Sequence, residues 1–207
     1  MNEKRPNVQT LIAKAREENA ECLDLGNCGL TEIPNEISEL KQLQFLGLGV
    51  FFINDLGQPT FPGTMKYCNQ LTDLKPLSGL TQLTHLYLSE NQVSDVSSLS
   101  DLTQLTYLDL SDNSLSAFPT FLLELENLAY LNLHGNPLLD VPAQVLGESP
   151  TNNCLEAVRA HFKDRKYQPV LDRKIKLVLL GNGGVGKTSI TKRLIHGKFD
   201  PNEKSTH

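Results

Sequence analysis

A glycine-rich segment near the C-terminal end of the sequence has the residue types and the spacing of a phosphate-binding loop. Residues 181–188 read GNGGVGKT, which matches the pattern G-x-x-x-x-G-K-[ST]. Its glycines let the backbone approach closely, so that amide groups and the start of the next helix face phosphate oxygens. We expect Lys187 to reach the β- and γ-phosphate oxygens, and Thr188 to hold Mg²⁺ through its hydroxyl. The predicted site comprises Gly181, Asn182, Gly183, Gly184, Val185, Gly186, Lys187, Thr188 and Ser189.

The residues on either side of this loop predict the elements that must position it. KIKLVLL before the loop is suited to a buried strand, and SITKRLI after it continues as a helix. A glycine-rich turn that binds no ligand is the alternative. Hydrolysis also needs an acidic residue after a second strand and a group that orients water, and neither follows Lys187. The 38 residues from Val170 to His207 are too few for a nucleotide-binding sheet, so we expect this chain by itself to have no catalytic residues and no turnover.

The first two thirds of the chain consist of repeated leucine patterns. LTHLYLSENQVSDV starts at Leu83, LTYLDLSDNSLSAF at Leu105 and LAYLNLHGNPLLDV at Leu128, with steps of 22 and 23 residues. An earlier copy, AECLDLGNCGLTEIP, has Cys28 where the later copies have asparagine. The pattern L-x-x-L-x-L-x-x-N/C-x-L is that of leucine-rich repeats, which stack into a solenoid.

This pattern fixes which side chains the solenoid must bury. Leucines around each short strand alternate inward, so we expect Leu86, Leu108 and Leu131 to line up in one common core. The asparagine of each copy should satisfy backbone groups at the turn of its coil, because an orphaned buried group costs about 1 to 3 kcal/mol. These asparagines are Asn91, Asn113 and Asn136.

The copy that starts at Leu43 is interrupted. Leu48 and its asparagine, Asn69, lie 21 residues apart, against 3 residues for Leu88 and Asn91. We interpret residues from about 49 to 68 as an inserted loop, because aligning Asn69 backwards would place Lys66 in a buried leucine position. Its aromatic residues either pack on the solenoid, which is the favoured interpretation, or meet a partner; they are Phe51, Phe52, Phe61 and Tyr67.

Amphipathic helices are predicted at both ends of the repeats. Leu11, Ile12 and Ala15 have helical spacing before the first strand, and Leu155, Val158 and Phe162 lie on one helical face after the last repeat. The predicted organisation is an N-terminal capping helix at 1–19, repeats at 20–147, a C-terminal cap helix and linker at 148–172, and the start of the phosphate-binding domain at 173–207.

Residues that point outward from the strands form a candidate surface for a protein partner. The middle of this surface is rich in aromatic rings with polar tips, a chemistry favoured at recognition surfaces, although tyrosine also suits any strand by propensity. Neither His85 with His134, two coils apart, nor any Ser–His–Asp set makes a convincing metal or catalytic site. The predicted partner-binding residues on this concave face are Phe45, His85, Tyr87, Tyr107, Asp109, Tyr130, Asn132 and His134.

Composition argues against several classes of partner. The net charge of -5 and pI near 5.5 favour neither nucleic acid nor an anionic membrane. There is no secretory signal, no stretch of about 18 apolar residues and no C-x-x-C pair. We therefore expect a cytoplasmic location and reduced cysteines.

The repeats, a basic linker and the segment KIKLVLLGNGGVGKTSITKRLIHGKFDPNEKSTH together resemble the N-terminal portion of a Roco protein. In that family leucine-rich repeats precede a Ras-like Roc GTPase domain and a COR dimerisation domain. The resemblance implies an α/β fold: a leucine-rich-repeat solenoid, or horseshoe, with a helical cap, followed by an incomplete P-loop GTPase strand–loop–helix.

The same resemblance implies GTP or GDP with Mg²⁺ as ligands of the parent protein, and Thr206 as the switch threonine that coordinates the metal. It also implies a homodimer of the parent through a COR domain, which lies outside this sequence, as do the D-x-x-G and N-K-x-D motifs. We expect residues 1–207 alone to bind no nucleotide. The alternative is a stand-alone repeat scaffold with a non-functional P-loop tail.

The linker carries a run of basic residues near the predicted phosphate site. A solvated helix surface followed by a connector that contains Pro169 is the favoured interpretation, and electrostatic help for an anionic ligand is the alternative. The basic residues are Arg159, Lys163, Arg165, Lys166, Arg173, Lys174 and Lys176.

Overall fold

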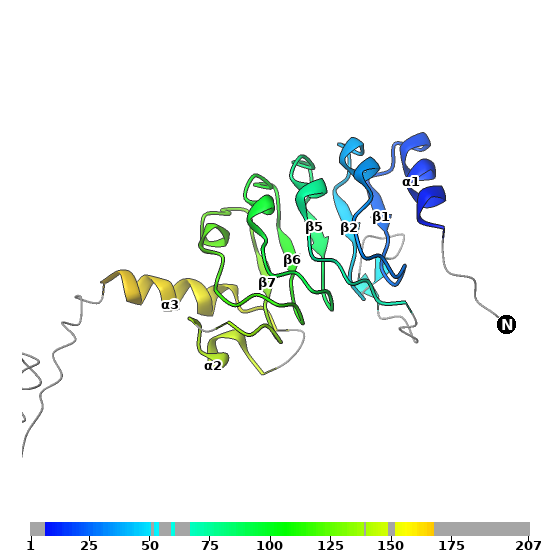
Figure 1. Cartoon of the computed structure of the whole chain (residues 1–207). Coiled ribbons are helices and arrows are strands. Elements are labelled where there is room, and N and C mark those ends of the chain that lie inside the picture. The colour runs from blue at the N-terminus through cyan, green and yellow to red at the C-terminus, as the bar shows by residue number, and fades with distance from the viewer. Residues whose placement is uncertain are drawn as a thin grey trace, which may run out of the picture. The chain divides into compact units, whose positions relative to one another are not determined.

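Each repeat contributes one three-residue strand to a single parallel sheet (Figure 1). The strands lie in the order β1-β2-β5-β6-β7, so neighbours in the repeat series are neighbours in space. We call the solvent-facing side of this sheet, which corresponds to the predicted concave face, the sheet face. The strands are β1 (Cys22–Asp24), β2 (Phe45–Gly47), β5 (His85–Tyr87), β6 (Tyr107–Asp109) and β7 (Tyr130–Asn132).

This computed structural model describes residues 7–50, 52–53, 59–60, 67–138, 140–148 and 152–167. The chain divides into two units, Met1–Tyr167 and Gln168–His207. The whole of the second unit, and with it every predicted phosphate-binding residue, lies outside the described residues. No helix among the described residues is long and apolar enough to cross a membrane.

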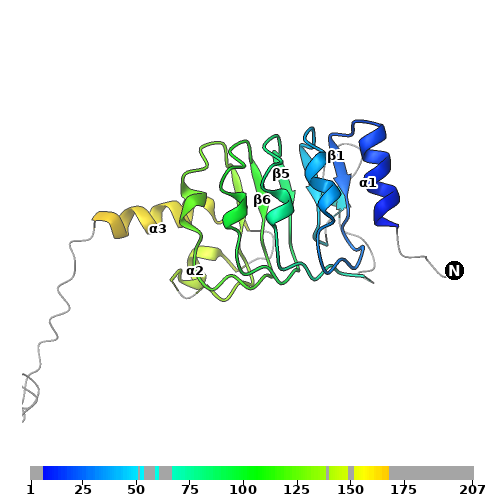
Figure 2. The ribbon, with the colours of Figure 1, turned by 45° about the horizontal axis from the view of Figure 1, so that its top comes forward.

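Short 3-10 helices return the chain on the side of the coils opposite the sheet (Figure 2). Two of them start after an aspartate whose side chain accepts a backbone hydrogen bond: Asp73 from Lys75 at 2.9 Å and Asp95 from Ser97 at 2.8 Å. Such local side-chain-to-backbone bonds favour a tight turn over a long helix. The four helices are η1 (Asn35–Glu39), η2 (Lys75–Leu77), η3 (Ser97–Leu99) and η4 (Thr120–Leu123).

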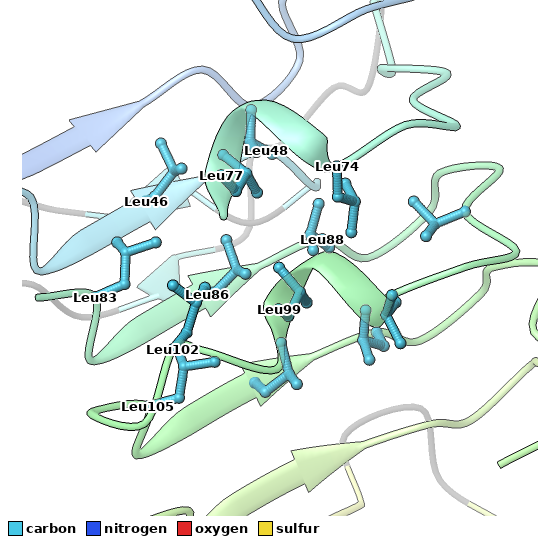
Figure 3. Packing of buried hydrophobic residues seen from close by; sticks show 14 of the residues in the cluster. Leu46, Leu48, Leu74, Leu77, Leu83, Leu86, Leu88, Leu99, Leu102 and Leu105 are labelled. Atoms are coloured by element: carbon cyan, nitrogen blue, oxygen red, sulfur yellow. The ribbon is translucent and has the colours of Figure 1, made fainter. Parts of the chain in front are cut away.

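The space between the sheet and the 3-10 helices is filled by leucines (Figure 3). Leu86, Leu108 and Leu131 are in register in adjacent strands, and each is fully buried. The predicted common core is therefore confirmed. Because burial of one leucine contributes about 1.5 to 3 kcal/mol, the stacked coils are stable together although a single coil could not bury its own leucines.

An asparagine ladder runs beside this core and joins each coil to its neighbours. In Asn113 the side-chain amide donates to the carbonyl oxygens of Leu88 at 2.9 Å and Leu110 at 3.1 Å. The Asn113 Oδ1 atom accepts from the backbone amide of Val93 at 3.0 Å. Asn91 and Asn136 make the equivalent bonds, which confirms the predicted role of these residues.

The first coil is covered by α1 (Val8–Glu17), which packs beside β1. Asn7 caps this helix, since its Oδ1 accepts from the Thr10 amide at 3.3 Å. The face of α1 that carries Ile12 and Ala15 is buried against the core.

The last coil is covered by α3 (Leu155–Tyr167), after the short α2 (Ala143–Leu146). Leu155 and Val158 are buried. Phe162 packs on Phe118 with ring centroids 4.8 Å apart, so all three residues of the predicted apolar face contact the repeats. Just before α3, the Cys154 amide donates to the Leu131 carbonyl at 2.8 Å, and the Asn153 Oδ1 accepts from the Leu131 amide at 3.1 Å.

Part of the predicted insertion is described. The strands β3 (Phe52–Ile53) and β4 (Pro59–Thr60) are antiparallel, and β3 lies against β1 and β2. The Tyr67 amide donates to the Asn27 side chain at 2.6 Å. These contacts agree with packing of the insertion on the solenoid. Phe51 and Phe61 lie outside the described residues.

Candidate protein-interaction surface

Four of the predicted partner-binding residues form a stack of rings across the sheet face. We call this stack the aromatic ladder; its members occupy the first position of four adjacent strands and are each partly exposed: Phe45, His85, Tyr107 and Tyr130. Successive ring centroids are 4.4, 5.8 and 4.1 Å apart, with interplanar angles of 19°, 13° and 1°. The stacking follows from the register, because equivalent side chains of neighbouring parallel strands lie about 4.8 Å apart.

The last two residues of the aromatic ladder, Tyr107 and Tyr130, interact through their hydroxyl groups as well as by stacking. The Tyr107 and Tyr130 side chains are hydrogen-bonded to each other, and the two rings are parallel. Burial raises the pKa of both phenols, and the charge of Asp109 raises the pKa of each further. Both tyrosines are therefore neutral hydrogen-bonding groups at physiological pH.

The tautomer of His85 follows from its neighbour. The Thr84 hydroxyl donates to the Gln44 carbonyl oxygen at 3.0 Å, so its only proton is used. The His85 Nδ1 atom, 2.9 Å from the same hydroxyl oxygen, must then carry the proton and donate. Burial lowers the pKa of His85, which favours the neutral ring and leaves Nε2 as a hydrogen-bond acceptor.

Three other predicted partner-binding residues are not exposed, and the prediction that they present side chains to a partner is wrong in this respect. Tyr87 is 1% exposed, Asp109 1% and Asn132 0%. The Tyr87 ring lies 4.9 Å from that of Tyr107, so the aromatic ladder itself covers part of it. Burial, and then the charge of Asp109, raises the pKa of Tyr87 to about 12.

Asp109 and Asn132 turn their side chains to their own backbone. The Asp109 Oδ1 atom accepts from the Ser111 amide at 2.9 Å and the Ser111 hydroxyl at 2.7 Å. The Asn132 Oδ1 atom accepts from the His134 amide at 3.1 Å. Desolvation raises the pKa of Asp109, although the two bonds from Ser111 oppose this shift. His134, the last predicted residue, is half-buried and lines a shallow pocket with Gln144 and Glu148 rather than joining the aromatic ladder.

Sequence reasoning missed two exposed acidic residues in the turns after β5 and β6. Glu90 and Asp112 occupy the same turn of adjacent coils, with φ values of 52° and 50°. Each directly precedes the asparagine of its repeat, Asn91 or Asn113, and this repeated sequence position could have identified them. Thr84 and Thr106 were also missed; their hydroxyls donate to the carbonyl oxygens of Gln44 and Thr84, the residues directly before the strands of the preceding coils.

Comparisons with known proteins match both parts of the chain. Models described as leucine-rich repeat match residues 19–40 and 67–115, and a model described as "Ras of Complex, Roc, domain of DAPkinase" matches residues 176–207. A curated relative from an unknown prokaryotic organism, named Roc-COR-CHAT protease, is 34% identical over 131 residues. That alignment covers 62% of this chain and 12% of the relative.

Solved structures with similar coordinates include two internalins from Listeria monocytogenes str. 4b F2365. Internalin C2 is 28% identical with a TM-score of 0.48, over 70% of this chain and 53% of that chain. The internalin inlF is 24% identical with a TM-score of 0.45, over 63% of this chain and 32% of that chain.

The coordinates and the sequence matches define a leucine-rich-repeat protein. The Roc match and the Roc-COR relative add the second part, so that the chain has a Roco-like architecture of leucine-rich repeats followed by a Roc region. Residues 181–189 and Thr206 fall within this Roc match but outside the described residues.

Proposed function

We propose that this chain is the repeat-bearing, protein-binding module of a Roco-like regulatory GTPase, and that the aromatic ladder is its partner-binding surface. The observation that carries the proposal is the ladder itself: four partly exposed rings in register on the sheet face. Rings held by their neighbours lose little conformational entropy on binding. Tyrosine is enriched among the residues that dominate binding energy at interfaces.

Cross-linking from the aromatic ladder tests this proposal. A photoreactive phenylalanine analogue at position 107 should yield one discrete adduct with a partner in cells, whereas the same analogue at Ser100, exposed beside η3, should not. The adduct should disappear when Tyr130 is replaced by Ser in the same protein. Adducts that are equally abundant from positions 107 and 100 would show that the ladder has no special role.

We further propose that the Roc region binds GTP or GDP with Mg²⁺ through residues 181–189. The P-loop pattern and the Roc match over residues 176–207 support this assignment. Residues 176–207 contain neither D-x-x-G nor N-K-x-D, so we expect residues 1–207 alone not to bind nucleotide at micromolar concentrations.

Nucleotide titration tests both statements. Micromolar GDP binding by residues 1–207 that is lost in Lys187→Ala would contradict the second statement and support the first. For a protein with a complete Roc domain, Lys187→Ala should reduce GDP affinity at least about tenfold. Unchanged affinity there would remove Lys187 from the proposed site and favour a repeat scaffold with a non-functional P-loop.

A further inference from the structure

The repeats that contain β5, β6 and β7 carry ionisable charges of one sign only, apart from histidine. From residue 76 to residue 158 the sequence contains no lysine or arginine, but it contains ten aspartates and glutamates. The strands β5, β6 and β7 lie within this range, and so do three of the four residues of the aromatic ladder. An electrostatic field of one sign over a surface attracts partners of the opposite charge and repels partners of the same charge.

Part of this negative charge lies in the turns that follow the strands of the sheet face. The Glu90 amide donates to Ser111 at 3.0 Å and the Asp112 amide donates to His134 at 2.7 Å, so the two acidic turns are tied to the next coils in the same way. Both side chains are exposed. The charge of Asp112 raises the pKa of Asp109, and the charge of Asp109 raises the pKa of Tyr107 and Tyr130. Glu90 and Asp112 follow β5 and β6, whose first residues, His85 and Tyr107, belong to the aromatic ladder.

We propose that the sheet face binds an arginine-bearing segment of a protein partner, laid across the aromatic ladder with its cationic groups paired to Glu90 and Asp112. This inference rests on the proposed function of the ladder and names the chemistry of its partner. Guanidinium groups can make both required contacts, since they stack on aromatic rings and donate two parallel hydrogen bonds to a carboxylate. Ammonium groups are more strongly hydrated and lack the planar fork.

The size of the surface sets the length of the segment. Four strands at about 4.8 Å spacing give a ladder of roughly 14 Å, which an extended chain at about 3.3 Å per residue crosses with about five residues. A short unstructured peptide can therefore reproduce the contact.

The probe is a fluorescein-labelled peptide of about nine residues in which arginine alternates with glycine and serine, titrated into residues 1–207 by fluorescence anisotropy. Citrulline in place of every arginine keeps the shape and removes the charge. The arginine peptide should bind at least about tenfold more tightly than the citrulline peptide. Its affinity should fall as salt rises, because the pairing is exposed.

Two double variants with the same change in net charge locate the contact. Glu90→Gln with Asp112→Asn should weaken the arginine peptide about tenfold, whereas Glu124→Gln with Glu126→Gln, also exposed but between η4 and β7, should weaken it less than about threefold. Circular dichroism checks that both variants fold. Equal weakening by the two pairs would mean that only the net charge acts, and the proposed contact would be overturned.

The remaining outcomes separate this inference from the function on which it rests. Equal binding of the arginine and citrulline peptides, lost on Tyr107→Ser, would overturn the charge inference while the ladder remained a binding surface. Arginine-peptide binding that is indifferent to Tyr107→Ser would contradict the role of the ladder. Sedimentation tests whether residues 1–207 self-associate. Self-association that is abolished in the Glu90→Gln, Asp112→Asn double variant would show that a second copy of this chain, and not a separate partner, binds the sheet face.

Discussion

The side-chain amide of Asn69 donates a 2.8 Å hydrogen bond to the carbonyl oxygen of Leu48, 21 residues earlier in the chain. In an uninterrupted coil the equivalent bond joins residues only three positions apart, as between Asn113 and Leu110. Asn91 from the next coil donates to the same Leu48 oxygen at 3.1 Å. The asparagine ladder is thus continuous across the insertion, and this coil closes although 21 residues separate its leucine from its asparagine.

Replacement of Asn69 by alanine should lower the free energy of unfolding by about 3 kcal/mol, because it removes the partners of the Leu25 carbonyl and the Leu30 amide and leaves the Leu48 carbonyl with only the bond from Asn91. Urea denaturation of residues 1–207 measures the change. The matched control is Asn127→Ala, at an exposed asparagine whose amide donates to the Thr103 carbonyl, and it should cost less than about 1 kcal/mol. Similar losses of unfolding free energy in the two variants would contradict a special role for Asn69 in the asparagine ladder.

Burial separates Tyr87 from Tyr130 although both are strand tyrosines. Tyr87→Ala should destabilise the fold by about 3 kcal/mol or more, as for other buried aromatic residues, since its side chain is 1% exposed. Tyr130 is partly exposed, and Tyr130→Ala should cost about 1 kcal/mol, mainly through the lost stacking on Tyr107. Thermal and chemical unfolding of the two variants gives the comparison, and the reverse order would contradict it.

Asp109 makes stability depend on pH in a direction that can be stated. Desolvation raises its pKa above the ordinary value of 3.8, so the folded state binds this proton more tightly than the unfolded chain does. The stabilising effect of the protonated carboxyl of Asp109 is complete below the unfolded pKa, and it is lost as the pH rises through the folded pKa. Asp109 is therefore unfavourable for folding at neutral pH.

Asp109→Asn should remove this cost and keep the bonds from Ser111, because Asn132, in register in the next coil, already accepts its own backbone bond in this way. The variant should be more stable than the parent at pH 7 and no more stable at pH 3. Urea unfolding at both pH values measures this difference. A gain of the same size at pH 3 would show that ionisation of Asp109 is not the cause.

Alanine at Gly47 and alanine at Gly49, both in the β2 coil, should respond differently to a second substitution that removes the neighbouring side chain. A Cβ at Gly47 would lie 2.7 Å from the Asp24 Oδ1 atom, whereas a Cβ at Gly49 would lie 2.6 Å from the Ser89 backbone nitrogen. Each alanine variant should cost about 1 to 3 kcal/mol through overpacking. Adding Asp24→Ala should recover most of the loss at Gly47, while Ser89→Ala should recover little at Gly49, because the backbone remains. Rescue at both sites in unfolding experiments would contradict the backbone clash.

Much of this fold follows from the repeat period alone. Stacked coils place Leu86, Leu108 and Leu131 in one register, and the ladder asparagines at one turn, whatever the other residues are. The period also predicted which residues point to the sheet face, and so it found the four members of the aromatic ladder.

Exposure on that face could not be predicted in the same way. Alternation along a strand gives the direction of Tyr87, Asp109 and Asn132, but their burial depends on side-chain conformation. Tyr87 is covered by a neighbouring ring, and Asp109 and Asn132 fold back to backbone amides two residues ahead. The hydroxyl contact between Tyr107 and Tyr130 likewise depends on rotamers that the repeat pattern does not specify.

The backbone bonds that Leu131 makes to Asn153 and Cys154 have a consequence for assembly. Leu131 is the middle residue of β7, the last strand of the sheet, and a row of unused amides and carbonyls there would be a template for a foreign strand. Both groups are already taken by the chain just before α3. A foreign strand would have to displace this segment before it could pair with Leu131, so the edge of the sheet at β7 is a poor template for growth of a fibre.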